Sequence, residues 1–565
     1  MQLNPIVFIV LLAALPAPVV LAQDCDLSIA SLATSGKPGN LPSGGPSLSF
    51  NGRFVAFTSS ATDLVAGDTN GQVDCFVADR RSGIVERVNL SSSGAQANGF
   101  STEAKVSEDG HFVVFLSKAT NLDPKDTDTV SDVYLHDRVT QTTVLVSERL
   151  GSGIKLDGCI KAEVSGNGRY VVFLCADTDV LPGVPAWNAY VRDTWSGTTE
   201  VVSIGPAGQM DAASGYSPDI SDDGRFVVFL STILSWGTPS TGAQTGLWLR
   251  DRQLGTTVAI TLTPSGEIAN CGFGEPAISG DGRYVAFWSC SSNLLPPSEP
   301  HGIYDIVRWD RLSGEMIAVS STYTNQGNPS GAGLPGISND GTKVVFYSGY
   351  DQVTPGPPAP QSVYLTDLET KTTRNLQSNA AGDLGNASTL WSTISGDGRT
   401  AAFDSYSINL VRGITTNATQ VYVRSCDTAL PMTYCVPTKG STGCAMRVGS
   451  IGTPSASAGS GFQVRLEKAP AQAPLLLFYG TSGDWGTPYG AGWLCVKSPL
   501  KRAVAGASAA GANCAAPWST DFNAYVAAGV DGDLVAGAVV HLQGWARNSA
   551  GEGQLSDALA LVLEP

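Results

Sequence analysis

A short pattern of apolar and polar positions recurs along the first three quarters of the chain. In the stretch Ile278–Phe287, a polar pair ending in glycine separates two runs of mainly apolar residues, and six further copies lie between Ser49 and Phe403. The pair is usually Asp-Gly or Asn-Gly, which favours the positive φ of a tight hairpin turn. Successive copies are 56 to 59 residues apart, with turn glycines at Gly52, Gly110, Gly168, Gly224, Gly282, Gly341 and Gly398. This regular spacing predicts a repeat architecture with seven β-hairpins.

Within one repeat, the pattern predicts four short strands. In the fifth repeat, the run Tyr284–Phe287 follows the turn, Asp305–Asp310 follows a polar loop, and Met316–Ser320 follows a Leu-Ser-Gly turn. Both faces of Tyr284–Phe287 are apolar, as is typical of a sheet that is packed on both sides. Seven four-stranded sheets, each between two neighbours, predict an all-β seven-bladed β-propeller.

The ring is expected to close through a strand from the N-terminal end of the chain. The seventh repeat supplies Thr393 to Arg424 and has no fourth strand before the composition changes, whereas Leu27–Ser31 has the layout of a last strand. Cys25 and Cys426 would then lie at the two ends of one short turn. Such ends approach within about 7 Å, so a disulfide can join them.

The remaining cysteines predict further disulfides. There are eleven cysteines and no Cys-x-x-Cys pair, which in an exported chain favours disulfides over a zinc site. Cys159 and Cys175 straddle the turn of one repeat, Cys271 and Cys290 straddle that of another, and Cys75 is left as the free thiol. In the C-terminal part, the simplest of three pairings is Cys435–Cys444 with Cys495–Cys514.

Three regions follow from this reading. Residues 1–22 are expected to be a signal peptide cleaved after Ala22, with an uncleaved N-terminal anchor as the alternative. Residues 23–426 form the propeller, and the Gly-, Ala- and Ser-rich segment 427–565 contains apolar runs typical of a β-sandwich. No later stretch has some 18 uninterrupted apolar residues, so no membrane insertion of the mature chain is expected. The protein is predicted to be secreted, periplasmic or attached to the cell envelope.

The turn motif resembles the TolB-type repeat, also called the WD-like β-propeller repeat, of exported bacterial proteins. Five of the seven turns carry the family's arginine after the glycine, and His111 and Thr342 depart from it; the five are Arg53, Arg169, Arg225, Arg283 and Arg399. The segment 427–565 looks like a module that recurs on large secreted bacterial proteins. The resemblance implies a propeller fold, although the family is better known for six blades.

Charge narrows the classes of partner. The formal net charge is −16, which argues against nucleic acid, because neutralising phosphates needs clustered Lys and Arg. An acidic surface favours cations, or serves solubility.

Two acidic loops are candidate metal sites. Oxygen-bearing side chains at positions 1, 3 and 7 of each loop could hold Ca²⁺, which takes only oxygen ligands. Asp79 and Asp137 occupy position 12 but lie about 17 Å further along a strand, so they cannot close the sites. The alternative is that the acidic residues cap turns. The candidate ligands are Asp68, Asn70 and Asp74 in the first repeat and Asp126, Asp128 and Asp132 in the second.

The motifs of common hydrolases are missing. The sequence contains no Gly-x-Ser-x-Gly, His-Glu-x-x-His or P-loop pattern, and its four histidines are scattered. An aspartate ends the third strand in six of the seven repeats, on the same rim as the turn arginines. A set that is copied this evenly is expected to stabilise the scaffold, because catalysis needs a unique site.

Aromatic residues on the expected long loops are the remaining candidates for ligand contact. They suit stacking on sugars or contact with proteins, and the alternative is that they pack on neighbouring loops. We therefore expect a non-enzymatic binding or scaffolding protein that contacts a protein or glycan through its long-loop face. The alternative is an extracellular polysaccharide hydrolase or lyase with its site in the propeller funnel and acids such as Asp68 or Asp126 taking part. The candidate ligand-binding residues are Trp187, Trp236, His301, Tyr304 and Trp391.

Overall fold

The computed structural model describes most of the chain from residue 26 to residue 563. In the repeat region it omits residues 151–157, 211–213, 233–235, 237–245, 263–268, 296–304, 321–331, 350–360, 380–381, 412–417 and 426. Beyond residue 426 it describes 432–434, 446–451, 455–467, 469–470, 472–481, 484–489, 492–496, 499–507, 518–529, 531–535, 538–547 and 553–563. The expected signal peptide, residues 1–22, lies outside these segments.

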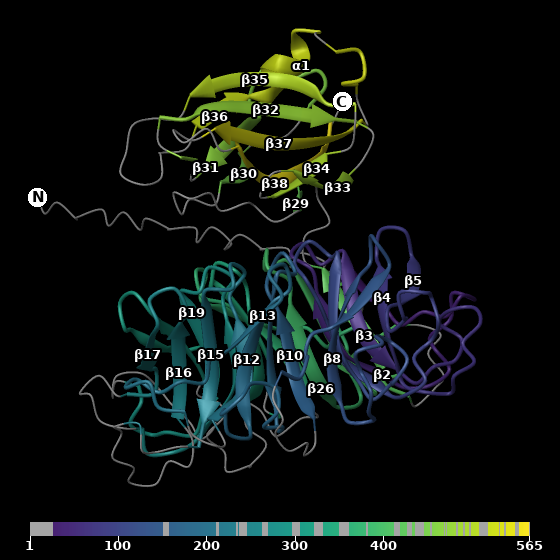
Figure 1. The fold of residues 1–565 in the computed structure, drawn as a ribbon. Helices are drawn as coiled ribbons and strands as arrows, with labels where there is room; N and C mark the ends of the chain where they lie inside the picture. Colours follow the sequence, from purple (N-terminus) through teal and green to yellow (C-terminus); the bar gives the residue numbers. More distant parts are fainter. Residues whose placement is uncertain are drawn as a thin grey trace, which may run out of the picture.

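Seven four-stranded antiparallel sheets make up the repeat region (Figure 1). Blade 1 consists of β2 (Ser43–Leu48), β3 (Phe54–Ser59), β4 (Asp74–Asp79) and β5 (Ile84–Arg87). Blade 2 consists of β6 (Ser101–Val106), β7 (Phe112–Ser117), β8 (Asp132–Asp137) and β9 (Thr142–Leu145). Blade 3 consists of β10 (Cys159–Val164), β11 (Tyr170–Cys175), β12 (Asn188–Asp193) and β13 (Thr198–Val201). Blade 4 consists of β14 (Ser214–Ile220), β15 (Phe226–Ser231), β16 (Gly246–Asp251) and β17 (Thr256–Ala259). Blade 5 consists of β18 (Phe273–Ile278), β19 (Tyr284–Ser289), β20 (Asp305–Asp310) and β21 (Met316–Ala318). Blade 6 consists of β22 (Gly333–Ile337), β23 (Lys343–Ser348), β24 (Ser362–Asp367) and β25 (Thr372–Asn375).

Blade 7 is closed by the predicted N-terminal strand. It consists of β26 (Thr389–Ile394), β27 (Thr400–Ser405) and β28 (Gln420–Ser425), and β1 (Asp26–Ile29) pairs antiparallel with β28. Asp26 lies opposite Ser425, and Ile29 lies opposite Tyr422. The first strand of each blade contacts the first strand of the next, including β26 with β2, so the ring is complete. The predicted seven-bladed propeller with its N-terminal closing strand is confirmed.

Each blade is apolar on both faces because it packs between two others. One cluster joins Ala56 and Val77 of blade 1 to Val113 and Phe115 of blade 2, and all four residues are fully buried. Aromatic residues on the second and third strands also stack across a blade, as Phe115 does on Tyr134 with ring centroids 5.7 Å apart. This double burial accounts for the uninterrupted apolar runs in the sequence.

The turn glycines fit against the preceding blade. Gly224 has φ of +69°, and a Cβ at this position would lie 2.1 Å from Cδ2 of the Tyr170 ring in blade 3. Four other turn glycines meet an aromatic ring of the preceding blade in the same way: Gly110, Gly168, Gly282 and Gly341. Turn geometry and inter-blade packing therefore both require glycine.

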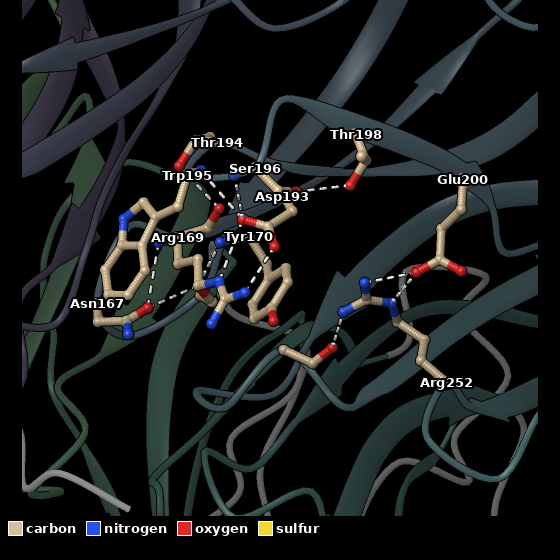
Figure 2. Close-up of polar contacts among 12 residues, drawn as sticks. Asn167, Arg169, Tyr170, Asp193, Thr194, Trp195, Ser196, Thr198, Glu200 and Arg252 are labelled. Atoms are coloured by element: carbon tan, nitrogen blue, oxygen red, sulfur yellow. Dashed lines mark hydrogen bonds and ion pairs between the residues drawn. The ribbon is translucent and has the colours of Figure 1, made fainter. Parts of the chain in front are cut away.

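Ion pairs line the rim that carries these turns. In blade 3, Arg169 donates through Nε and Nη2 to the two carboxylate oxygens of Asp193, at 3.1 and 2.7 Å (Figure 2). Tyr170 lies beside two guanidinium groups, those of Arg169 at 4.8 Å and Arg252 of blade 4 at 4.6 Å from the ring centroid. Equivalent arginine–aspartate pairs are Arg53–Asp79, Arg225–Asp251 and Arg283–Asp310. The ion pairs connect strands within a blade, and the contact of Arg252 with Tyr170 connects neighbouring blades. The aspartate carboxylates are therefore occupied by arginine side chains.

Both disulfides predicted within blades are present. Cys159 is bonded to Cys175, Cys271 is bonded to Cys290, and Cys75 is a buried free thiol. The predicted pairs Cys25–Cys426, Cys435–Cys444 and Cys495–Cys514 involve residues or side chains outside the described part of the chain.

The C-terminal segment is a β-sandwich. A five-stranded sheet contains β29 (Met432–Tyr434), β38 (Gly553–Val562), β37 (Val539–Arg547), β32 (Pro474–Gly480) and β35 (Lys501–Ala507); a three-stranded sheet contains β30 (Arg447–Ile451), β31 (Gln463–Glu467) and β36 (Trp518–Asp521); and β33 (Asp484–Tyr489) pairs with β34 (Gly492–Val496). Residues of the two larger sheets share one core with the short helix α1 (Phe522–Ala527). Among the described residues, no helix has the length and hydropathy to cross a membrane.

Candidate functional site in the central cavity

A cavity of about 710 Å³ lies at the centre of the ring, lined by residues of all seven first strands. Each first strand shifts its register against the second strand, as between Thr102 and Lys105 in blade 2 and between Gly274 and Ala277 in blade 5. The residue inside this bulge often has positive φ and lines the cavity; Glu103 (φ 54°) and Glu275 (φ 46°) are examples. Bulges of this kind redirect side chains beside functional sites.

Blades 2 to 5 give the cavity a charged arc. Lys161 Nζ lies 3.3 Å from Glu103 Oε2, and Lys105 Nζ lies 2.8 Å from Glu163 Oε1, so two pairs link neighbouring blades. Asp219 on β14 belongs to the same group, and each of its carboxylate oxygens accepts a backbone N–H, from Ile220 at 2.8 Å and from Ile278 at 2.9 Å. Glu275 adds another carboxylate on β18. Carboxylates outnumber lysines along this arc.

The pKa values of these carboxyl groups are shifted in different directions by their surroundings. Burial and the neighbouring Glu163 raise the pKa of Asp219 to about 7, and burial also raises the pKa of Glu275. For Glu103, burial acts to raise the pKa, but Lys161 and Lys105 outweigh it and the pKa is lowered. Close to neutral pH, the cavity therefore contains both fixed charges and a carboxyl group that can gain a proton.

The opposite arc is largely neutral. Trp391 and Leu390 of blade 7 line the cavity with exposed fractions of 40% and 44%. Asp404 accepts the backbone N–H groups of both residues through Oδ1, at 3.0 and 3.1 Å, and that of Gly45 in blade 1 through Oδ2 at 3.2 Å. Lys161 Nζ lies 5.9 Å from the Trp391 ring centroid. An aromatic surface thus faces the charged arc across the cavity.

The predicted aromatic ligand-binding residues have different fates. Trp391 lies on a first strand in the cavity, not on a long loop. Trp187 is half-buried and stacks on Tyr216 of blade 4 with centroids 5.9 Å apart. Trp236 is only 4% exposed and packs edge-on against Phe229 and Trp248, so its assignment to a binding surface is wrong. It belongs instead to the apolar cluster between blades 3 and 4, together with Val191 and Val227. His301 and Tyr304 lie outside the described residues.

The two predicted metal loops also differ. In blade 1, Arg87 Nη2 lies 2.8 Å from Asp68 and 3.3 Å from Asp74, and Asn70 donates to Asp74 at 2.9 Å. In blade 2, Asp126, Asp128 and Asp132 bring one oxygen each within 4.8 Å of one another. Asp68 and Asp126, which the alternative of a polysaccharide hydrolase or lyase placed in the funnel, are not among the residues that line the described cavity.

The charged arc was not predicted from the sequence, because its residues stand at positions that differ from one repeat to the next. Glu103, Lys161 and Glu275 occupy one position of the aligned first strands, and Lys105, Glu163 and Asp219 occupy another two residues later. The signal that could have revealed them is the variation at these two positions among the seven aligned copies.

No family model matches the chain. No curated protein matches it either. Matching solved structures are the β-propeller domain of the Trilobed protease from Pyrococcus furiosus (12% identity, 68% of this chain and 94% of that chain, TM-score 0.41), oligogalacturonate lyase from Vibrio parahaemolyticus (12%, 72% and 97%, 0.43) and a putative TolB from Agrobacterium tumefaciens (16%, 68% and 90%, 0.30).

The repeat region is a seven-bladed β-propeller. The strand pairing and the contacts between blades establish this fold, since the TM-scores are too low to carry an argument. The relationship of the C-terminal sandwich to a module of secreted bacterial proteins stays a prediction.

Proposed function

We propose that this TolB-like propeller is an exported, non-enzymatic binding protein that holds a glycan residue in its central cavity. The supporting observation is Trp391, which is 40% exposed within a cavity whose opposite arc carries carboxylates and lysines. A sugar ring presents C–H groups that pack on an aromatic face and hydroxyl groups that hydrogen-bond to charged side chains. The two disulfides agree with an oxidising compartment.

The geometry suggests a role for each arc. Trp391 would provide the stacking surface, with its backbone held by Asp404. Glu275 and Asp219 would accept hydrogen bonds from sugar hydroxyls, and Lys161 would donate through N–H groups that its pair with Glu103 leaves available. This arrangement relocates the binding site from the long-loop face to the cavity, because Trp391 belongs to a cavity-lining strand.

A glycan array followed by calorimetric titration of the full chain tests the proposal. Trp391→Ala should weaken binding by about fivefold or more, because one stacked aromatic contributes on the order of 1 kcal/mol or more. Trp195→Ala is the matched control: Trp195 is 58% exposed on the outer turn of blade 3, away from the cavity lining. Equal affinity of the two variants, or binding to no glycan on the array, would reject the proposal.

A polysaccharide hydrolase or lyase is the second candidate. Burial and the neighbouring Glu163 raise the pKa of Asp219 to about 7, so this carboxyl group could donate or accept a proton near neutral pH, as a general acid or base does. Incubation of the purified chain with a panel of polysaccharides would reveal shortened or unsaturated products. If products form with the native chain and are lost in Asp219→Asn, the protein is an enzyme and the non-enzymatic proposal fails.

A further inference from the structure

Two loops with the same spacing of oxygen-bearing residues are stabilised in different ways. In blade 1, Asp74 Oδ1 accepts from Asn70 Nδ2 at 2.9 Å and from Asn89 Nδ2 at 2.6 Å. Arg87 Nη2 lies between Asp74 Oδ2, at 3.3 Å, and Asp68 Oδ1, at 2.8 Å. The Arg87 side chain is only 5% exposed. Asp68 Oδ1 and Asp74 Oδ2 accept no hydrogen bond of good geometry from the described residues, but the buried Arg87 guanidinium lies within ion-pairing distance of both oxygens and compensates their charge.

Blade 2 lacks the counterparts of two of these donors. Aligned by the repeat spacing, Asp128 stands where blade 1 has Asn70, and Leu145 stands where blade 1 has Arg87. Asp132 Oδ1 accepts from Ser147 Oγ at 2.7 Å and from Arg149 Nη1 at 2.9 Å. Asp132 is only 1% exposed, and its Oδ2 atom is buried without a hydrogen-bond partner among the described residues. A buried carboxylate oxygen left in this state is costly.

Several carboxylates gather around the same guanidinium group. Arg149 is shared, since its guanidinium lies 2.8 Å from Asp177 and 3.3 Å from Asp179 of blade 3 as well as contacting Asp132. Asp126 and Asp128 add two further carboxylates, and one oxygen of each lies within 4.8 Å of one oxygen of Asp132. Tyr134 donates to Asp126 Oδ2 at 2.6 Å and holds that side chain in place. Among the described residues, Arg149 is thus shared by three carboxylates, and those of Asp126 and Asp128 lie close to Asp132.

We propose that Asp126, Asp128 and Asp132 bind one Ca²⁺ ion, which takes the place that Arg87 occupies in blade 1. The donor set consists only of carboxylate oxygens, which suits a hard cation, and Ca²⁺ accepts the further backbone or water oxygens that a loop can offer. The chain therefore binds one ion and not two. Blade 2 uses the ion to fix the loop between β7 and β8, as blade 1 uses Arg87 for the equivalent loop. The site is independent of any ligand in the central cavity.

Calorimetric titration of the full chain with CaCl₂, after treatment with EDTA and removal of the chelator, tests the proposal, with MgCl₂ titrated in parallel. We expect one Ca²⁺ per chain and a higher melting temperature with Ca²⁺, because the ion binds only the folded state. Asp132→Asn and Asp128→Asn should each weaken binding by about tenfold or more, since affinity follows the charge of the ligands.

Two further variants sharpen the test. Asp63→Asn is the matched control: Asp63 accepts the Asn40 backbone N–H, and blade 2 has Asn121 in the same role, so one negative charge is removed while the contact is kept. This variant should bind Ca²⁺ like the native chain. Leu145→Arg supplies the guanidinium of blade 1 and should abolish the response to Ca²⁺ while the far-ultraviolet spectrum stays native.

Several results would overturn the proposal. The first is that the folded chain releases no heat and shows no thermal shift at about 1 mM Ca²⁺. The others are that the chain binds two ions, that it binds Mg²⁺ more tightly than Ca²⁺, or that Asp128→Asn binds Ca²⁺ with the affinity of the native chain. Asp128 is half-buried, so its variant decides the question even if Asp132→Asn does not fold.

Discussion

Replacing Gly224 with alanine tests how the blades are joined. Gly224 has φ of +69°, and a Cβ there would lie 2.1 Å from Cδ2 and 2.6 Å from Cγ of Tyr170. The ring has little room to move away, because Arg169 and Arg252 lie 4.8 and 4.6 Å from its centroid. Arg252 is in turn paired with Glu200, and Arg169 with Asp193 (Figure 2).

Two energetic contributions can be separated. Placing an alanine at this positive φ costs about 1–2 kcal/mol whatever its surroundings. Forcing a methyl group into the space of a fixed ring adds about 1–3 kcal/mol. Gly67→Ala is the matched control, because Gly67 has φ of +78° and nothing lies within 4 Å of the position of its Cβ. The difference between the two variants isolates the contact between blades 3 and 4.

Thermal unfolding of the full chain, followed by circular dichroism, measures this difference. At roughly 2 °C per kcal/mol for a large domain, Gly224→Ala should melt about 2–6 °C below Gly67→Ala. The double variant Gly224→Ala with Tyr170→Ala should show less than additive loss, because the ring that creates the clash is gone. Equal melting temperatures for the two single variants would refute the view that the turn glycines are needed for inter-blade packing.

Two further predictions concern pH and oxidation. The hydrogen bond from Arg283, together with the backbone N–H of Leu312, lowers the pKa of Asp310 to about 2. This pKa is below the unfolded value of about 3.9, so the pair stabilises the fold above pH 4 and its contribution is lost as the pH falls through 2. The melting temperature of Asp310→Asn should therefore lie below that of the native chain at pH 5 and approach it at pH 2, whereas a constant gap would contradict the assignment. The disulfide Cys159–Cys175 joins residues 16 apart in sequence, so the double variant Cys159→Ser, Cys175→Ser should lose about 3 kcal/mol of stability in denaturant unfolding. Reducing agent should then have a smaller further effect on that variant than on the native chain, and an unchanged effect would contradict the prediction.

The sequence by itself determined the repeat, the number of blades, the closing strand and two disulfides. These features depend on residues that are close in sequence or repeated at a fixed spacing. The Asp-Gly pair selects its turn locally, and the apolar runs of Tyr284–Phe287 and its copies show that both faces of a blade are buried. The seventh repeat has no fourth strand of its own, and Leu27–Ser31, which has the layout of a last strand, fills this place.

Only the tertiary structure decided which polar and aromatic residues share a site. Trp236 and Trp391 both appear as candidate surface residues in the sequence, yet one packs in the apolar cluster between blades 3 and 4 and the other lines the central cavity. Asp74 and Asp132 likewise occupy the same position of the repeat, but the first meets Arg87 and the second does not. The physical reason is that exposure and charge compensation depend on neighbours that the closed ring brings together from distant repeats, and the local pattern of one repeat does not contain them.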